Sequence, residues 1–203
     1  MWGRVVGRSS RRAAVYAAAL VLSAHATGSD SSAQPRAGRK HAPDAIGASM
    51  KIESTAFQQH GEIPRKYTCE GEDISPPLAF RQVPPETKSL ALIVDDPDAP
   101  DPKAPKTVWV HWVVFNLPPL APGLPEGAKL PAGATDGLND WKRTGYGGPC
   151  PPIGRHRYFF KLYALDTDLK GLTNPTKQEL EKAIQGHVVG TAELVGTYQK
   201  IRK

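Results

Sequence analysis

Three apolar runs, each bounded by Pro, Gly or Asp, dominate the pattern of hydrophobic and polar positions. They cover residues 88–95, 108–117 and 157–166 and are rich in β-branched and aromatic residues, which predicts strands. In the middle run both alternating sets are apolar. One set is Val108, Val110, Trp112 and Val114, and the other is Trp109, Val113 and Phe115. We therefore expect this strand to be covered on both faces, with His111 on the side of Trp109.

Weaker runs predict further strands over residues 51–57, 78–80 and 191–200. One helix is indicated by a capping box, in which Thr176 follows Pro175 and Glu179 stands three residues further on. Its apolar face continues through Leu180, Ala183, Ile184 and His187 before Gly190. Strands outnumber helices, and the 20 prolines and 19 glycines fall mainly between the apolar runs. This pattern predicts an antiparallel β-sandwich with one or two helices near the C-terminus.

The N-terminus has the three parts of a secretory signal peptide. Residues 1–12 are basic, residues 13–24 are largely apolar, and Ala24, His25 and Ala26 form a small-x-small cleavage pattern. A membrane anchor is the alternative, but this apolar stretch is shorter than the roughly 20 residues that a spanning helix needs. We expect cleavage after Ala26 and a secreted or periplasmic protein without stable membrane insertion. The pair Arg11 and Arg12 leaves open whether export uses the twin-arginine route or the Sec route.

Composition separates the folded part of the chain from what precedes it. Residues 27–49 are rich in small, polar and basic residues and contain one large aliphatic, Ile46, which predicts a disordered linker. The folded domain is expected over residues 50–203. The formal net charge of the chain is +6, but residues 50–203 hold 19 basic and 18 acidic residues. A nearly neutral domain lacks the positive electrostatic potential that attracts a phosphate backbone, which argues against nucleic-acid binding.

Polar residues interrupt or close the predicted strands at several points. Asp96 and Asp98 flank Pro97 directly after the first long run, His111 lies inside the second, and His156 and Tyr158 lie at the start of the third. Each has an ordinary explanation: a solvated turn, a core histidine bonded to the backbone, or decoration of a strand end. Two histidines, a tyrosine and an acidic cluster would then need separate structural roles. A common binding site is the alternative.

Four segments in sequence order resemble the phosphatidylethanolamine-binding protein family, and in particular its bacterial YbhB/YbcL-type branch, often described as Raf kinase inhibitor-like. They are DDPDAP, WVHWVVFNLP, GYGGPCPPIGRHRYFFKLYALD and TKQELEKAIQGHVVGTAELVGTY. The resemblance extends over residues 50–203. It implies a sandwich of a large and a small antiparallel sheet, C-terminal helices, and a pocket that holds phosphate or a phospholipid head group.

The resemblance also implies which residues form that pocket. They are Asp96, Asp98, Pro100, Trp109, His111, Pro149, His156 and Tyr158. The imidazoles and the tyrosine hydroxyl are suitable donors to a phosphate, and Asp96 is suited to orient an imidazole. Because a carboxylate repels a phosphate, a proton must lie between them. We therefore expect binding to weaken as the pH rises through the histidine range.

Only two cysteines occur, Cys69 and Cys150, and both follow the signal peptide. In an oxidising compartment a disulfide between them is the simplest expectation. The alternative makes Cys150 a nucleophile with His156 as its base, which would indicate a hydrolase.

The sequence is interpreted as a binding protein for a small anion rather than an enzyme, with no cofactor. Two alternatives stay open: a protein-interaction module that modulates a kinase or protease, and a weak phosphoester or carboxyl-ester hydrolase that uses the two histidines. Sequence motifs for a serine hydrolase, a nucleotide-binding loop and a dinucleotide-binding fold are absent. Asp96, His111 and His156 could together hold zinc, but the resemblance implies a pocket without metal. The oligomeric state is left open.

Overall fold

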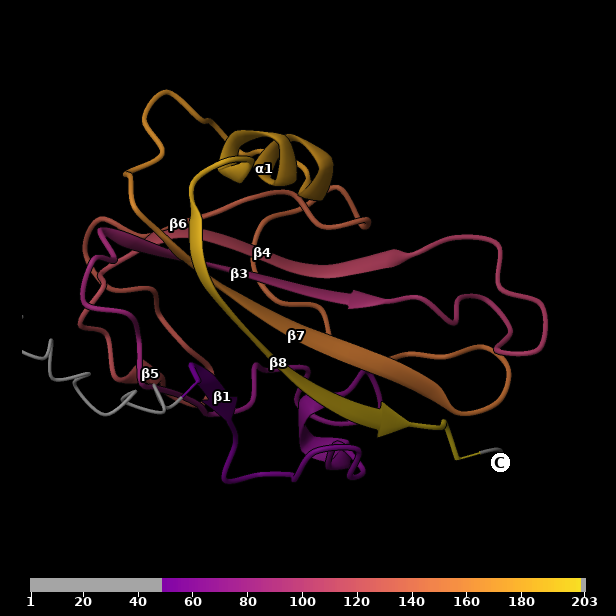
Figure 1. Ribbon diagram of the computed structural model, residues 1–203. Helices are drawn as coiled ribbons and strands as arrows, with labels where there is room; N and C mark the ends of the chain where they lie inside the picture. The colour runs from indigo at the N-terminus through magenta and orange to yellow at the C-terminus, as the bar shows by residue number, and fades with distance from the viewer. Residues whose placement is uncertain (1–48, 202–203) are drawn as a thin grey trace, which may run out of the picture. The chain divides into compact units, whose positions relative to one another are not determined.

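The structure is a computed structural model that describes residues 49–201, in which eight strands form two antiparallel sheets (Figure 1). The small sheet has the order β1-β2-β5, with β1 at Lys51–Glu53, β2 at Leu78–Arg81 and β5 at Gly123–Leu124. The large sheet has the order β6-β4-β3-β7-β8. Its strands are β6 at Thr135–Asp136, β4 at Trp109–Leu117, β3 at Ser89–Asp96, β7 at His156–Leu165 and β8 at Val188–Tyr198. The predicted sandwich of a large and a small sheet is confirmed.

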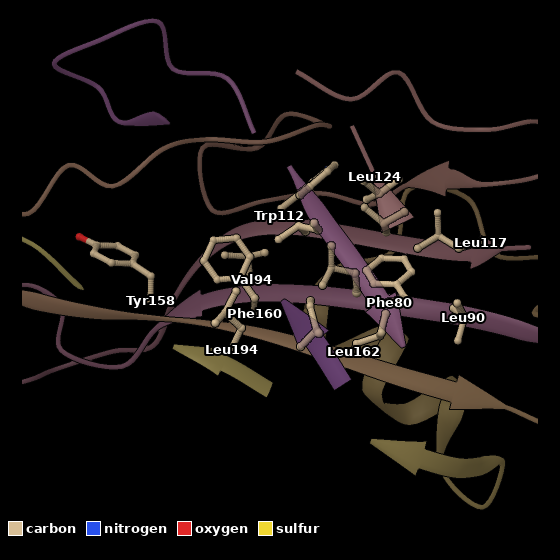
Figure 2. Packing of buried hydrophobic residues seen from close by; sticks show 14 of the residues in the cluster. Phe80, Leu90, Val94, Trp112, Leu117, Leu124, Tyr158, Phe160, Leu162 and Leu194 are labelled. Atoms are coloured by element: carbon tan, nitrogen blue, oxygen red, sulfur yellow. The ribbon is translucent and has the colours of Figure 1, made fainter. Parts of the chain in front are cut away.

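The main hydrophobic core joins the two sheets. Alternate residues of β3, namely Leu90, Leu92 and Val94, contact side chains of β7 and of the small sheet (Figure 2). Phe80 of β2 and Phe160 of β7 belong to the same cluster, and both are at most 4% exposed. Burial of each such side chain contributes about 1.5–3 kcal/mol. This core fixes the large sheet, whose far end carries the polar residues.

A second cluster covers the opposite face of the large sheet, where α1 packs (Figure 1). Helix α1 spans Lys177–Ile184, and its Leu180 and Ile184 are buried in this cluster. The predicted capping box is present, since the Glu179 backbone N–H donates to Thr176 Oγ1 and the Thr176 backbone N–H donates to Glu179 Oε2. The expected extension to His187 is wrong. That residue lies in the turn before β8, where its Nδ1 is 2.9 Å from Asp166 Oδ1.

A second short helix, the 3-10 turn η1, spans Arg65–Tyr67. Of the one or two C-terminal helices expected, residues 49–201 contain α1 alone. In the same range no helix has both the length and the apolar character that crossing a bilayer requires.

A β-bulge in β4 changes which residues face each side. Asp95 of β3 lies opposite Val110 while Val94 lies opposite Trp112, so His111 is the extra residue. The prediction that Val110 shares a face with Trp112 is therefore wrong. Val110 belongs to the cluster beneath α1, whereas Trp112 faces the core between the sheets. The bulge leaves His111 at the end of the sheet rather than in either core.

The predicted disulfide between Cys69 and Cys150 is formed, with a Cα–Cα distance of 5.4 Å. It joins the loop after η1 to the loop that leads into β7. The Cys69 backbone N–H donates to the Pro149 carbonyl at 3.1 Å, and the Gly148 N–H donates to Asp73 Oδ1 at 2.6 Å. A Cβ on Gly148 would lie 2.5 Å from the Tyr67 carbonyl oxygen, so the two loops meet too closely for any larger residue.

Replacing both cysteines by serine should lower the free energy of unfolding by about 2–4 kcal/mol, because the bond closes a long loop in the unfolded chain. The two cysteines are 81 residues apart. Urea unfolding of the double variant and of the reduced protein should give the same loss. An unfolding midpoint equal to that of the oxidised protein would contradict this expectation.

Candidate functional site

A cavity of about 310 Å³ lies at the end of the large sheet, where β3 ends and β4 and β7 begin. In Figure 1 this is the right-hand end, where the loop between β3 and β4 meets the loop that leads into β7. Its walls come from those loops and from the 139–145 turn. The lining residues are Asp96, Ala99, Pro100, Trp109, His111, Trp141, Cys150, Pro151, Pro152 and His156. A larger hollow of about 490 Å³ beside β1 and β8 has only exposed titratable residues, Lys51, Glu53 and Glu193, in its lining.

Asp96 and His156 form a buried pair in the cavity wall. His156 Nδ1 lies 2.7 Å from Asp96 Oδ2, and His156 Nε2 lies 2.9 Å from the Ile153 carbonyl oxygen. Since a carbonyl only accepts, Nε2 must carry a proton, and a second proton lies between Nδ1 and the carboxylate. The pair is therefore neutral overall wherever that second proton resides. Burial raises the pKa of Asp96 above its usual value, and the hydrogen bond from His156 opposes that rise.

His111 presents a different chemistry to the cavity. Its Nδ1 lies 2.7 Å from the Gly147 carbonyl oxygen, so Nδ1 carries the proton and donates it. The side chain is 3% exposed, and this burial lowers the pKa of His111 to about 4. At neutral pH the ring is uncharged. Nε2 is then the nitrogen left for the cavity, and it can only accept a hydrogen bond.

Aromatic rings surround His111. The Trp141 ring packs edge-on against it with centroids 5.1 Å apart, and Trp109 meets Trp141 in the same way at 5.4 Å. Tyr158 packs against the other side of His111 at 5.1 Å and stacks on His156 at 6.4 Å. Its hydroxyl is buried without a partner among the described residues and points away from the core side chains drawn in Figure 2.

The structure brings five of the eight predicted site residues into the cavity wall: Asp96, Pro100, Trp109, His111 and His156. The other three lie outside it. Asp98 accepts from Nε and Nη2 of Arg157 at 2.9 and 2.7 Å, which lowers the pKa of this carboxyl group. Pro149 is buried, with its carbonyl bound to the Cys69 N–H, and Tyr158 lies behind the two imidazoles.

Trp141 is a wall residue that sequence reasoning missed. It lies in an Asn-Asp-Trp-Lys turn with no apolar periodicity, so nothing local connects it to Trp109 or His111. The roles expected for the imidazoles are also corrected. His111 accepts rather than donates at neutral pH, and both nitrogens of His156 are already engaged.

The lining is mostly apolar and contains no Lys or Arg. Pro100, Pro151 and Pro152 contribute no backbone N–H to it. Among residues 49–201 no group of three or more His, Cys, Asp or Glu side chains is spaced to hold a metal ion. The cavity therefore suits a small ligand that brings its own hydrogen-bond donor and has an apolar part to set against the indoles and prolines.

The buried His111 should make stability depend on pH. The unfolded ring takes up a proton near pH 6.5 and the folded ring only near 4, so the unfolded state binds more protons between these values. The free energy of unfolding should then fall as the pH drops through this window, by up to about 3 kcal/mol.

A His111→Gln variant keeps a donor for the Gly147 carbonyl but does not titrate. The loss between pH 6.5 and 4 should therefore be smaller in this variant, as measured by urea unfolding at each pH. Asp96 acts in the opposite direction in both proteins, because its raised pKa favours the folded state as the pH falls. Identical pH profiles for the two proteins would contradict the assignment of a neutral His111.

Comparison with known proteins agrees with the fold. The family model for phosphatidylethanolamine-binding protein matches residues 53–199. A UPF0098 protein of Methanothermobacter thermautotrophicus is 51% identical over 155 residues, which cover 74% of this chain and 99% of that protein. The crystal structure of a phosphatidylethanolamine-binding protein homologue from Chlamydia trachomatis has 48% identity and a TM-score of 0.71, and covers 75% of this chain and 99% of its own. Escherichia coli YbcL, at 33% identity and a TM-score of 0.68, covers 76% and 100%. The chain is a member of the phosphatidylethanolamine-binding protein family.

Proposed function

We propose that the protein binds a small phosphate-type acid, either free or as the head group of an ester, and that it takes up this group in a protonated form. The observation that carries the proposal is the neutral His111, whose Nε2 is an acceptor at the cavity. A cavity of about 310 Å³ is large enough for a phosphate group with a short substituent.

The charge of the pocket favours the singly charged form of such a ligand. A phosphate monoester loses its second proton at a pH of about 6. The monoanion keeps one O–H, which can donate to His111 Nε2, whereas the dianion offers only acceptors. The dianion would also bring the second negative charge of the ligand close to Asp96, and the lining has no Lys or Arg to compensate it.

Binding rather than catalysis is the proposal for this site. The sulfur of Cys150 is held in the disulfide, so it offers no thiolate nucleophile to a substrate in the cavity. No Ser, Thr or Lys lines the cavity as a replacement. Action as a modulator of a kinase or protease remains a separate hypothesis that a pull-down of bound partners would test.

Titration with phosphoethanolamine at pH values from 5 to 8 tests the proposal directly. Affinity should fall by up to about tenfold for each pH unit above the second pKa of the ligand, because the bound form is the monoanion. His111 stays neutral throughout this range, so the ligand supplies the pH dependence. Isothermal titration calorimetry with inorganic phosphate in parallel distinguishes recognition of the phosphate from recognition of its substituent.

His111→Gln should abolish most of the binding, and His187→Gln is the matched control. His187 is an exposed histidine paired with Asp166 and lies outside the cavity lining. Affinity that stays constant or rises between pH 5 and 8, or binding that survives in His111→Gln, would refute the proposal.

We also propose that the protein is exported, which would bring the disulfide into an oxidising compartment. The predicted signal peptide and linker, residues 1–26 and 27–49, lie almost entirely outside the described residues. Expression of the full chain in an export-competent bacterium should yield a mature protein that begins at Thr27. Intact-mass measurement checks this, and a secreted product that retains Met1 would contradict it.

A further inference from the structure

We propose that Trp141 is a positioning residue that closes the outer wall of the cavity, keeps water from His111, and so determines which acid form of a ligand the pocket accepts. This inference rests on the proposed function, and it concerns the residue that controls the selectivity of the same site. Two observations support it: Asn139 holds the turn that carries Trp141, and the indole packs against Gly147 and His111.

The turn that carries Trp141 is clamped by a buried asparagine. Asn139 is 2% exposed, and its Oδ1 accepts from the backbone N–H groups of Trp141 at 3.0 Å and Arg143 at 3.3 Å. Its Nδ2 donates to the Gly145 carbonyl at 3.0 Å. Three hydrogen bonds from one buried side chain thus define the path of the turn. The indole is held in place by the fold although it is itself 40% exposed.

The indole rests on the peptide that also binds His111. A Cβ on Gly147 would lie 2.5 Å from Cζ3 of Trp141, so the ring lies directly against the glycine backbone. The carbonyl of Gly147 accepts the proton of His111 Nδ1 at 2.7 Å. Gly147 therefore fixes both rings, and they meet edge-on with centroids 5.1 Å apart.

Trp141 packs against His111 and is itself partly open to solvent. The guanidinium of Arg143 lies 5.8 Å from the centroid of the Trp141 ring, and Arg143 is exposed. Trp141 is 40% exposed whereas His111 is 3% exposed. His111 also contacts Tyr158 and the backbone of Gly147, which are both buried, and it lines the cavity.

The charges around His111 would favour its protonation if the ring were less buried. Asp95, Asp140 and Asp73 all act to raise its pKa, and burial outweighs them. Each of these acids has partners of its own, namely two lysines for Asp95, the Val110 N–H for Asp140, and the Gly148 N–H and Arg143 for Asp73. The Asp96–His156 pair is neutral overall. The uncharged state of His111 thus depends on burial, and Trp141 supplies part of that burial.

The first measurement is the pKa of His111 in ligand-free protein. It is obtained from the NMR signals of the His111 ring as a function of pH, in wild type, Trp141→Leu and Trp141→Phe. Leucine should raise the pKa by one unit or more, which is a tenfold gain in proton affinity, because water then reaches the ring. Phenylalanine should keep it close to wild type. Arg143→Met controls for displacement of the guanidinium and should give less than half of the leucine effect.

The second measurement uses dimethyl phosphate, which carries a permanent single charge and no acidic O–H. Wild type should bind it weakly at every pH from 5 to 8. In Trp141→Leu its affinity should rise severalfold as the pH falls through the new pKa of His111, because the imidazolium can donate to it. A merely structural role for Trp141 would lower affinity for all ligands without this change of selectivity.

The two proposals fail in different ways. If wild type binds no phosphate compound, the proposed function is refuted, and the control of ligand form by Trp141 falls with it. If wild type binds phosphoethanolamine but the pKa of His111 is the same in a folded Trp141→Leu variant, the role of Trp141 alone is refuted. Urea unfolding confirms that each variant is folded before its pKa is compared.

Discussion

The burial of three carboxylates at the end of β3 is the constraint on which the helix, the cavity and the start of β7 all depend. Asp95, Asp96 and Asp98 are each at most 5% exposed, and a buried carboxylate needs a partner. Asp95 pairs with Lys161 of β7 and Lys177 at the start of α1, which ties the helix to the sheet. Asp96 binds His156 in the cavity wall, and Asp98 binds the Arg157 side chain and backbone N–H. One short acidic segment thus organises three separate parts of the molecule.

The same constraint explains why the cavity is electrically neutral. Asp96 is compensated within the wall by a histidine whose second nitrogen is fixed by the Ile153 carbonyl. His111 is uncharged because burial outweighs the acids near it. Neither imidazole is therefore available as a cation. The proposed selectivity among acids by the proton that they carry follows from this neutrality, whereas Lys or Arg in the lining would favour the more highly charged form.

Sequence patterns predicted the long strands and the helix start because each has a local physical signature, and the disulfide because the chain has only two cysteines. The strands β5 and β6, with two residues each, have no period to detect. The bulge at His111 depends on how β4 pairs with β3, so alternation along β4 alone assigned Val110 to the wrong face. The family resemblance supplied five wall residues, but it did not reveal that His156 is saturated or that Trp141 closes the wall. The Asp96–His156 bond and the Trp109–Trp141 contact join positions far apart in sequence, and the bond from His156 to the Ile153 carbonyl depends on the conformation of the loop before β7.

The cavity presents an acceptor nitrogen of a neutral His111 and a fully engaged His156. Long-range proton–nitrogen NMR correlation of the histidine rings at pH 7 reads these states directly, since protonated and bare ring nitrogens have distinct shifts. We expect His111 to carry its proton on Nδ1 with a bare Nε2, and His156 to be protonated on Nε2. A signal from His111 with protons on both nitrogens, or with the proton on Nε2, would contradict it.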